Sequence, residues 1–76
     1  MEEICRIIEN ALGLKAGSVN INDNKDTIKF WDSLGLLSIL SGLEEKYGNK
    51  VTTIEDLSKV KSVKEIIEVL KRESII

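Results

Sequence analysis

Apolar residues recur every three or four positions in three segments of this 76-residue chain, and polar stretches separate these segments. This spacing places the apolar side chains on one face of a helix. It predicts helices over residues 2 to 12, 33 to 47 and 63 to 72, and no segment shows the alternation typical of a strand. The predicted core stripe of the second helix consists of Leu36, Leu40, Leu43 and Tyr47, broadened by Leu37 and Ile39.

Capping patterns predict where the later helices begin. Ser62 followed three positions later by Glu65 forms a capping box, which opens the last helix. Thr52 with Glu55, or Thr53 with Asp56 in a weaker form, repeats the pattern and predicts a short helix over residues 54 to 59. The sequence therefore predicts an all-α fold, a small bundle of three main helices plus one short helix, and residues 1 to 76 form one domain.

A long polar connection over residues 14 to 31 joins the first two predicted helices. Loops of this length are uncommon in compact domains unless they have a function or are held against the core. The apolar residues expected to hold this loop are Leu14, Val19, Ile21, Ile28, Phe30 and Trp31. Trp31 is expected to be a packed anchor.

Composition and charge exclude several classes of function. The 13 acidic and 11 basic residues leave a net charge of −2, with no basic cluster suited to nucleic acid. The chain has no histidine, and Cys5, its single cysteine, is expected to be a buried structural thiol. We expect no catalytic residue and no metal ligand. No signal peptide and no membrane span is apparent, so a cytoplasmic location is expected.

One serine stands where the polar loop meets the second predicted helix, within Trp31-Asp32-Ser33-Leu34. Asp32 and Ser33 are both good N-cap residues, so the Ser33 hydroxyl is expected at the helix start. Unpaired N–H groups and a partial positive charge at a helix N-terminus favour an anion such as a phosphate ester. Without a histidine as a base, this serine suits covalent modification better than catalysis.

The segment Asp32-Ser33-Leu34 resembles the attachment motif of the acyl carrier protein family, which includes peptidyl carriers. The resemblance extends to the acidic end of the second helix at Glu44-Glu45 and to the last helix from Ser62. It implies that a phosphopantetheinyl transferase attaches 4'-phosphopantetheine from coenzyme A to Ser33, between Asp32 and Leu34. Asp32 is then a second helix cap, an acidic group that orients the transferase, or both.

The resemblance also implies a monomer that meets acyl-loading and acyl-transferring enzymes. Three nearly consecutive leucines at a helix start cannot all face inward, so at least one, Leu34, is expected to be exposed as a docking contact. The other implied partner contacts are Leu37, Glu44, Glu45, Ile54 and Val60. Core packing is an equal alternative for Ile54 and Val60, and a solvated helix end is the alternative for the two glutamates.

The cargo remains open at this point. Acyl intermediates of fatty-acid-like, polyketide or other specialised biosynthesis come first, and an aminoacyl or peptidyl group is the alternative. A small helical interaction module without a prosthetic group is a further alternative. Gly35 and Ser38 stand where family members often carry carboxylates, so partner recognition is expected to depend on apolar contact more than on charge.

Overall fold

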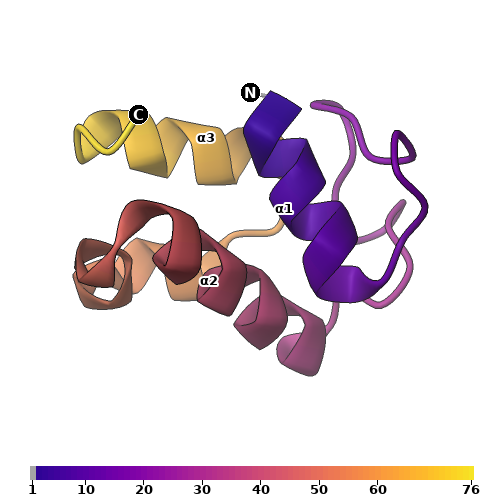
Figure 1. The fold of residues 1–76 in the computed structure, drawn as a ribbon, viewed down its shortest axis with the longest axis horizontal. Helices are drawn as coiled ribbons and strands as arrows, with labels where there is room; N and C mark the ends of the chain where they lie inside the picture. Colours follow the sequence, from indigo (N-terminus) through magenta and orange to yellow (C-terminus); the bar gives the residue numbers. More distant parts are fainter. Residues whose placement is uncertain (1) are drawn as a thin grey trace.

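The computed structural model describes residues 2–76, and the regular elements within them are helices. In chain order these are α1 (Glu2–Leu12), α2 (Ser33–Tyr47), the 3₁₀-helices η1 (Asn49–Thr53) and η2 (Glu55–Lys59), and α3 (Val63–Arg72) (Figure 1). In the described residues, strand-like pairing is limited to one isolated bridge between Asn24 and Ser62. The predicted all-α bundle is confirmed, and its three main helices have the predicted bounds.

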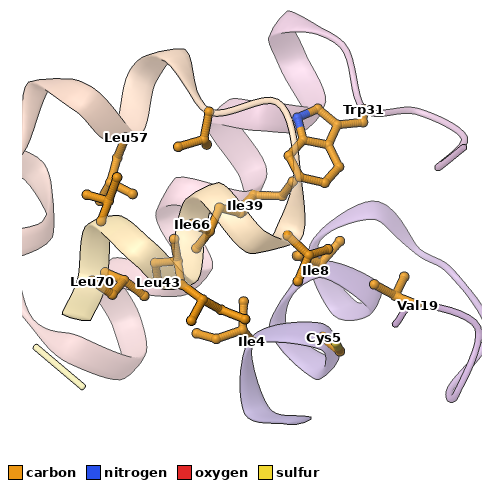
Figure 2. Close-up of a cluster of buried hydrophobic side chains, with 14 of the residues drawn as sticks. Ile4, Cys5, Ile8, Val19, Trp31, Ile39, Leu43, Leu57, Ile66 and Leu70 are labelled. Carbon is orange, nitrogen blue, oxygen red and sulfur yellow. The ribbon is translucent and has the colours of Figure 1, made fainter. Parts of the chain in front are cut away.

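The helices, the 3₁₀-helices and the long loop all contribute to one hydrophobic core (Figure 2). Helix α1 packs mainly against α2, and α3 completes the bundle (Figure 1). The largest fully buried apolar side chains are Ile4, Ile8, Ile39, Leu43, Leu57, Ile66 and Leu70. Because each of the three helices supplies at least one of these side chains, none of the helices can bury its apolar face alone.

The buried face of α2 differs from the predicted stripe. Gly35, Ile39 and Leu43 are buried, four positions apart, whereas Leu36 and Leu40 are only partly buried. Tyr47 is also partly buried, and Leu37 is exposed. The prediction counted apolar side chains and therefore missed a glycine at the centre of the contact face.

Two glycines allow α2 to approach its neighbours closely. A Cβ atom at Gly35 would collide with the backbone carbonyl oxygen of Phe30. A Cβ atom at Gly42 would lie 2.9 Å from Cγ2 of Ile7 on α1. Glycine inside a helix costs about 1 kcal/mol relative to alanine. Close packing accounts for this cost at both positions.

The prediction that Thr52 caps a helix over residues 54 to 59 is wrong. The Thr52 hydroxyl instead donates to the Asn49 carbonyl within η1, at 2.7 Å. The residue that precedes η2 is Ile54, whose side chain makes no capping hydrogen bond. A threonine hydroxyl that is satisfied by its own turn is not available to cap the next one. The predicted short helix is present as the 3₁₀-helix η2, and η1 is an additional short 3₁₀-helix before it.

Val19, Ile28 and Trp31 hold the long loop against the core as predicted. Leu14 is partly buried against the same core. Ile21 and Phe30 are exposed, so the prediction that they tuck under the helices is wrong. Both lie beside backbone turns, where the chain direction, and not hydrophobicity, decides which way a side chain projects.

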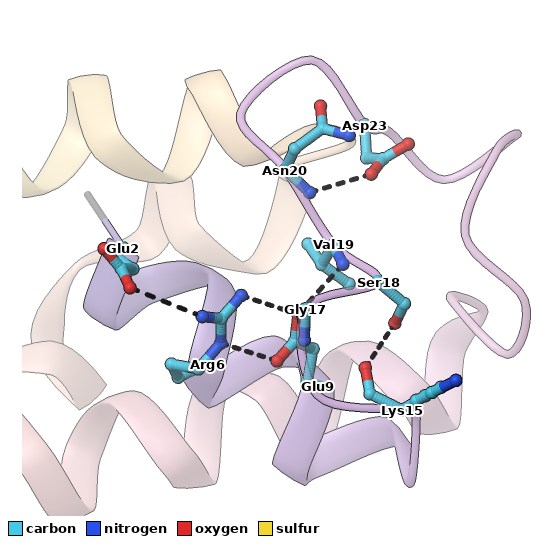
Figure 3. A network of polar contacts seen from close by, with 9 residues as sticks. All are labelled: Glu2, Arg6, Glu9, Lys15, Gly17, Ser18, Val19, Asn20 and Asp23. Atoms are coloured by element: carbon cyan, nitrogen blue, oxygen red, sulfur yellow. Dashed lines mark hydrogen bonds and ion pairs between the residues drawn. The ribbon is translucent and has the colours of Figure 1, made fainter.

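A buried carboxylate holds the start of the loop to α1 (Figure 3). Glu9 is only 2% exposed and accepts hydrogen bonds from Nε and Nη2 of Arg6, at 2.6 and 2.9 Å. It also accepts backbone N–H groups from Gly17 at 3.1 Å and Val19 at 2.9 Å. The Arg6 hydrogen bonds first, and then those from the loop backbone, lower the Glu9 pKa from 4.5 to about 2, against the opposing effect of burial.

The far part of the loop pairs with the chain just before α3. The Lys25 N–H donates to the Lys61 carbonyl at 2.8 Å, and the Val63 N–H donates to the Asp23 carbonyl at 3.1 Å. Ser62 caps α3 as predicted, because its hydroxyl accepts the N–H of Glu65 at 3.1 Å. The return bond of the predicted capping box differs, since the Glu65 carboxylate accepts the N–H of Lys61 and not that of Ser62.

Candidate functional site

Ser33 is the first residue of α2, and Asp32 is the N-cap that precedes it. The Oδ1 atom of Asp32 accepts the N–H of Gly35 at 2.9 Å. Of the two possible caps in the sequence, the carboxylate therefore takes the role. Ser33 is exposed, and its hydroxyl makes no hydrogen bond to any other residue of the described chain. The capping function and the free hydroxyl thus belong to two neighbouring residues.

The turn before Ser33 is fixed by one buried and one exposed aromatic residue. Trp31 is buried, which confirms its predicted role as an anchor. Phe30 has a φ of 72°, a left-handed conformation that is rare for a bulky side chain. Its carbonyl accepts the N–H of Asp32 at 3.0 Å and lies against Gly35. This turn carries the chain out of the core and directly into the first turn of α2.

Three exposed apolar side chains lie on the segment that contains Ser33. Leu34 is 76% exposed, Leu37 61% and Phe30 58%. The predicted exposure of Leu34 is therefore confirmed. Ser33 and Leu37 are four positions apart, and so lie on the same side of α2. Phe30, Leu34 and Leu37 all lie within four positions of Ser33 in the sequence.

The charges near Ser33 are few. The first turn of α2 carries no acidic residue. Lys29 places its ammonium nitrogen 5.7 Å from the centroid of the Phe30 ring, within reach of a cation–π interaction. Glu44 is partly buried and Glu45 is exposed, near the opposite end of the helix. At 1.5 Å per residue they lie roughly 16 to 18 Å from Ser33 along the axis.

The remaining two predicted partner contacts, Ile54 and Val60, belong to the core. Both side chains are buried, so the packing alternative describes them, and docking contacts at these two residues are not supported. Ile54 also contributes to the floor of a groove of about 310 Å³ between α2 and the 3₁₀-helices. Leu37, Leu40 and Leu57 line the same groove, which therefore begins one helical turn from Ser33.

Other chemistry is sparse in the described residues. Cys5 is buried as predicted, and this burial raises the pKa of its thiol, which makes the thiolate scarce at neutral pH. Residues 2–76 contain no group of three histidine, cysteine, aspartate or glutamate side chains placed to hold a metal ion. Of the helices described, none combines the length and the apolar character needed to cross a bilayer.

Comparisons of the chain with protein-family models, with curated proteins and with solved structures find no match. A functional assignment therefore depends on the residues at the start of α2. Sequence reasoning found Ser33, Asp32 and Leu34 there. It missed the exposure of Phe30 and the position of the Lys29 ammonium group over the Phe30 ring. No sequence pattern predicts a positive φ at a phenylalanine, because glycine or asparagine is the usual residue at such a position.

Proposed function

We propose that the chain is a carrier protein that bears acyl groups as thioesters on a 4'-phosphopantetheine arm attached to Ser33. The observation that carries the proposal is the exposed, uncommitted hydroxyl of Ser33 at the first position of α2, beside a cap that Asp32 supplies. A modifying enzyme can reach this hydroxyl without breaking any contact of the fold. The resemblance of Asp32-Ser33-Leu34 to the carrier motif adds to this argument.

The modification follows from the chemistry of a primary hydroxyl. The Ser33 oxygen attacks the phosphorus of coenzyme A that bears the pantetheine, a P–O bond to the serine forms, and 3',5'-adenosine bisphosphate leaves. The serine proton passes to a base on the transferase, because this chain has no histidine. The phosphodiester that results carries one negative charge, which the N-terminus of α2 stabilises. The bound arm supplies the thiol that carries the acyl group.

The groove beside Leu37 supports an apolar cargo. It opens one turn from Ser33 and is lined by Leu37, Leu40, Ile54 and Leu57 among others. A flexible arm on Ser33 brings its end group within reach of this groove. An apolar acyl chain gains free energy against these four side chains by leaving water, and the groove also carries the carboxylates of Glu44 and Glu55. We therefore rank acyl groups above the aminoacyl or peptidyl alternative.

The proposed partners are the transferase and the enzymes that load and unload the arm. Leu34 and Leu37 are the proposed apolar contacts, since both are exposed next to Ser33. Glu44 and Glu45 form a second, acidic contact farther along α2. Charges at the rim of an interface affect the association rate more than the affinity, so the leucines are expected to contribute more to binding.

The test is intact-mass measurement after incubation with coenzyme A and a broad-specificity phosphopantetheinyl transferase. The wild-type chain is expected to gain one phosphopantetheine, on the peptide that contains Ser33. Ser33→Ala is expected to gain nothing, whereas the control Ser62→Ala, which alters the serine at the start of α3, is modified normally. An unmodified wild-type chain would favour the interaction module without a prosthetic group. Modification of Ser33→Ala would place the attachment elsewhere.

A further inference from the structure

The groove between α2 and the 3₁₀-helices combines an apolar floor with polar side chains of one kind. Val51, Ile54 and Leu57 form the floor and are buried, and Leu37 and Leu40 form the wall on the side of α2. The other lining side chains are hydroxyls and carboxylates, and no lysine or arginine of the described chain is among them. The groove therefore offers oxygen atoms above an apolar surface.

Most of these oxygen atoms can only accept hydrogen bonds. The Thr52 hydroxyl donates its proton to the Asn49 carbonyl at 2.7 Å, and the Ser58 hydroxyl donates its proton to the Glu55 carbonyl at 2.7 Å. A hydroxyl that has given its one proton keeps only acceptor capacity. Of the side chains that line the groove in the described chain, Ser41 alone still has a proton to donate.

The two carboxylates of the groove have no cationic partner in the fold. Glu44 is partly buried and Glu55 is exposed, and the ion pairs of the described residues include neither of them. A carboxylate beside an apolar surface attracts a cation more strongly than one surrounded by water, because the local dielectric constant is lower. The groove is thus complementary to an apolar chain that carries hydrogen-bond donors and a positive charge.

We infer that the groove selects a cargo in which an apolar acyl segment ends in an amino group. This inference rests on the proposed function, which places the cargo on an arm at Ser33. At 1.5 Å per residue, Leu37 lies about 6 Å and Glu44 about 16 Å from Ser33 along α2. A chain that enters from Ser33 therefore passes the leucines before its end meets the carboxylates. An α-aminoacyl group has the opposite order, because its charge stands next to the thioester.

The test compares three cargoes of equal length, attached to Ser33 from amide-linked analogues of coenzyme A. The end of the cargo is a methyl group in hexanoyl, an ammonium group in 6-aminohexanoyl and a carboxylate in 5-carboxypentanoyl. The shifts of backbone amide resonances along the groove measure the ratio of docked to free cargo. We expect this ratio to be roughly two- to fivefold higher for 6-aminohexanoyl than for hexanoyl, the effect of an ion pair near the surface. It is expected to be lowest for 5-carboxypentanoyl.

Matched variants separate the two carboxylates from the overall charge of the protein. Glu44→Gln and Glu55→Gln are each expected to reduce the advantage of 6-aminohexanoyl, whereas docking of hexanoyl stays unchanged. Glu68→Gln removes the same charge from an exposed position on α3 that does not line the groove, and is expected to keep the full advantage. Raising the salt from about 0.1 M to about 1 M is expected to reduce the advantage in the wild type. The loaded proteins are compared, so differences in loading rate do not enter.

The outcomes separate cargo selection from the proposed function. Equal docking of the three cargoes, or an advantage that survives Glu44→Gln and Glu55→Gln together, would overturn the selection and leave Ser33 as the attachment site. A wild-type chain that cannot be loaded would overturn both. In that case the unmodified chain is titrated with hexylammonium and with hexanol. Shifts confined to the groove, and larger with hexylammonium, would identify a free amine and not a tethered cargo as the occupant.

Discussion

Two serines stand at the starts of two helices, and the fold uses them differently. Ser62 is the N-cap of α3, and its hydroxyl accepts the N–H of Glu65 at 3.1 Å. Ser33 is one position farther along, as the first residue of α2, because Asp32 has taken the cap. The Ser62 hydroxyl is thus bonded within the fold, whereas the Ser33 hydroxyl is left exposed on its surface. A shift of one position separates a structural serine from one that is open to modification.

The two helix starts also differ in their third residue. In both helices the N–H of this residue donates to the cap. In α3 it belongs to Glu65, whose side chain turns back to the N–H of Lys61. In α2 it belongs to Gly35, where the Phe30 carbonyl fills the space of a side chain. The start of α2 is therefore closed on the side of the loop and open on the side of Ser33.

The loop before α2 can be loosened at Glu9, which has no counterpart before α3. In Glu9→Gln, an amide nitrogen would face the N–H donors that now surround the carboxylate, so we expect a marked loss of stability at pH 7. The folded-state pKa of Glu9 is about 2, below its ordinary value of 4.5. The stabilisation of the folded state by the ionised Glu9 carboxylate is therefore complete above pH 4.5 and is lost as the pH falls towards 2.

Thermal unfolding of both proteins between pH 7 and pH 2 measures this effect. The difference in melting temperature between wild type and Glu9→Gln is expected to shrink as the pH falls below about 4.5. Using the difference cancels the titration of the other carboxylates. A gap that is independent of pH would mean that Glu9 acts through packing and not through its charge.

Gly35→Ala tests the closed side of the α2 start. A Cβ atom there collides with a backbone oxygen of the loop, which cannot move without disturbing the turn at Phe30. We expect a loss of about 1–3 kcal/mol in the free energy of unfolding, despite the better helix propensity of alanine. Gly42→Ala is the control, because its Cβ meets a side-chain methyl of Ile7 that can shift. Equal effects in urea denaturation would contradict the assigned backbone contact.

The smallest expected effect compares the two serines directly. Ser62→Ala removes a cap and is expected to cost about 1 kcal/mol in the free energy of unfolding. Ser33→Ala removes an exposed hydroxyl and is expected to stay within about 0.5 kcal/mol of wild type. Urea denaturation of the two unmodified variants measures both values. A larger loss for Ser33→Ala would reveal a structural role for its hydroxyl and weaken the contrast between the two helix starts.

The sequence predicted the main helices well because their signals are local. The caps at Asp32 and Ser62 and the spacing of apolar residues define helix ends without any knowledge of the tertiary structure. The same information identified Ser33 and the exposure of Leu34. The error at Thr52 arose because a hydroxyl can bond back into its own turn, and both arrangements fit the same residues.

The features that escaped prediction depend on distant parts of the chain. Glu9 finds its backbone partners eight and ten positions later, in a loop whose path no local pattern specifies. The buried position of Gly35 depends on the carbonyl of Phe30, and the exposure of the Phe30 ring depends on a backbone angle. Hydrophobicity alone assigns such a ring to the core. These contacts decide the surroundings of Ser33, and only the three-dimensional structure supplies them.

The pairing of residues 23 and 25 with residues 61 and 63 has a consequence for the order of folding. It joins positions nearly 40 residues apart and encloses α2 and both 3₁₀-helices in one loop of the chain. Closing so long a loop costs conformational entropy that contacts within one helix do not, and the packing of Gly42 against Ile7 closes a loop of similar length, so both form later than the helical turns themselves. The segment that leads to Ser33 then reaches its final shape only when α3 docks. A chain truncated before α3 would retain the motif but lose the presentation of its serine.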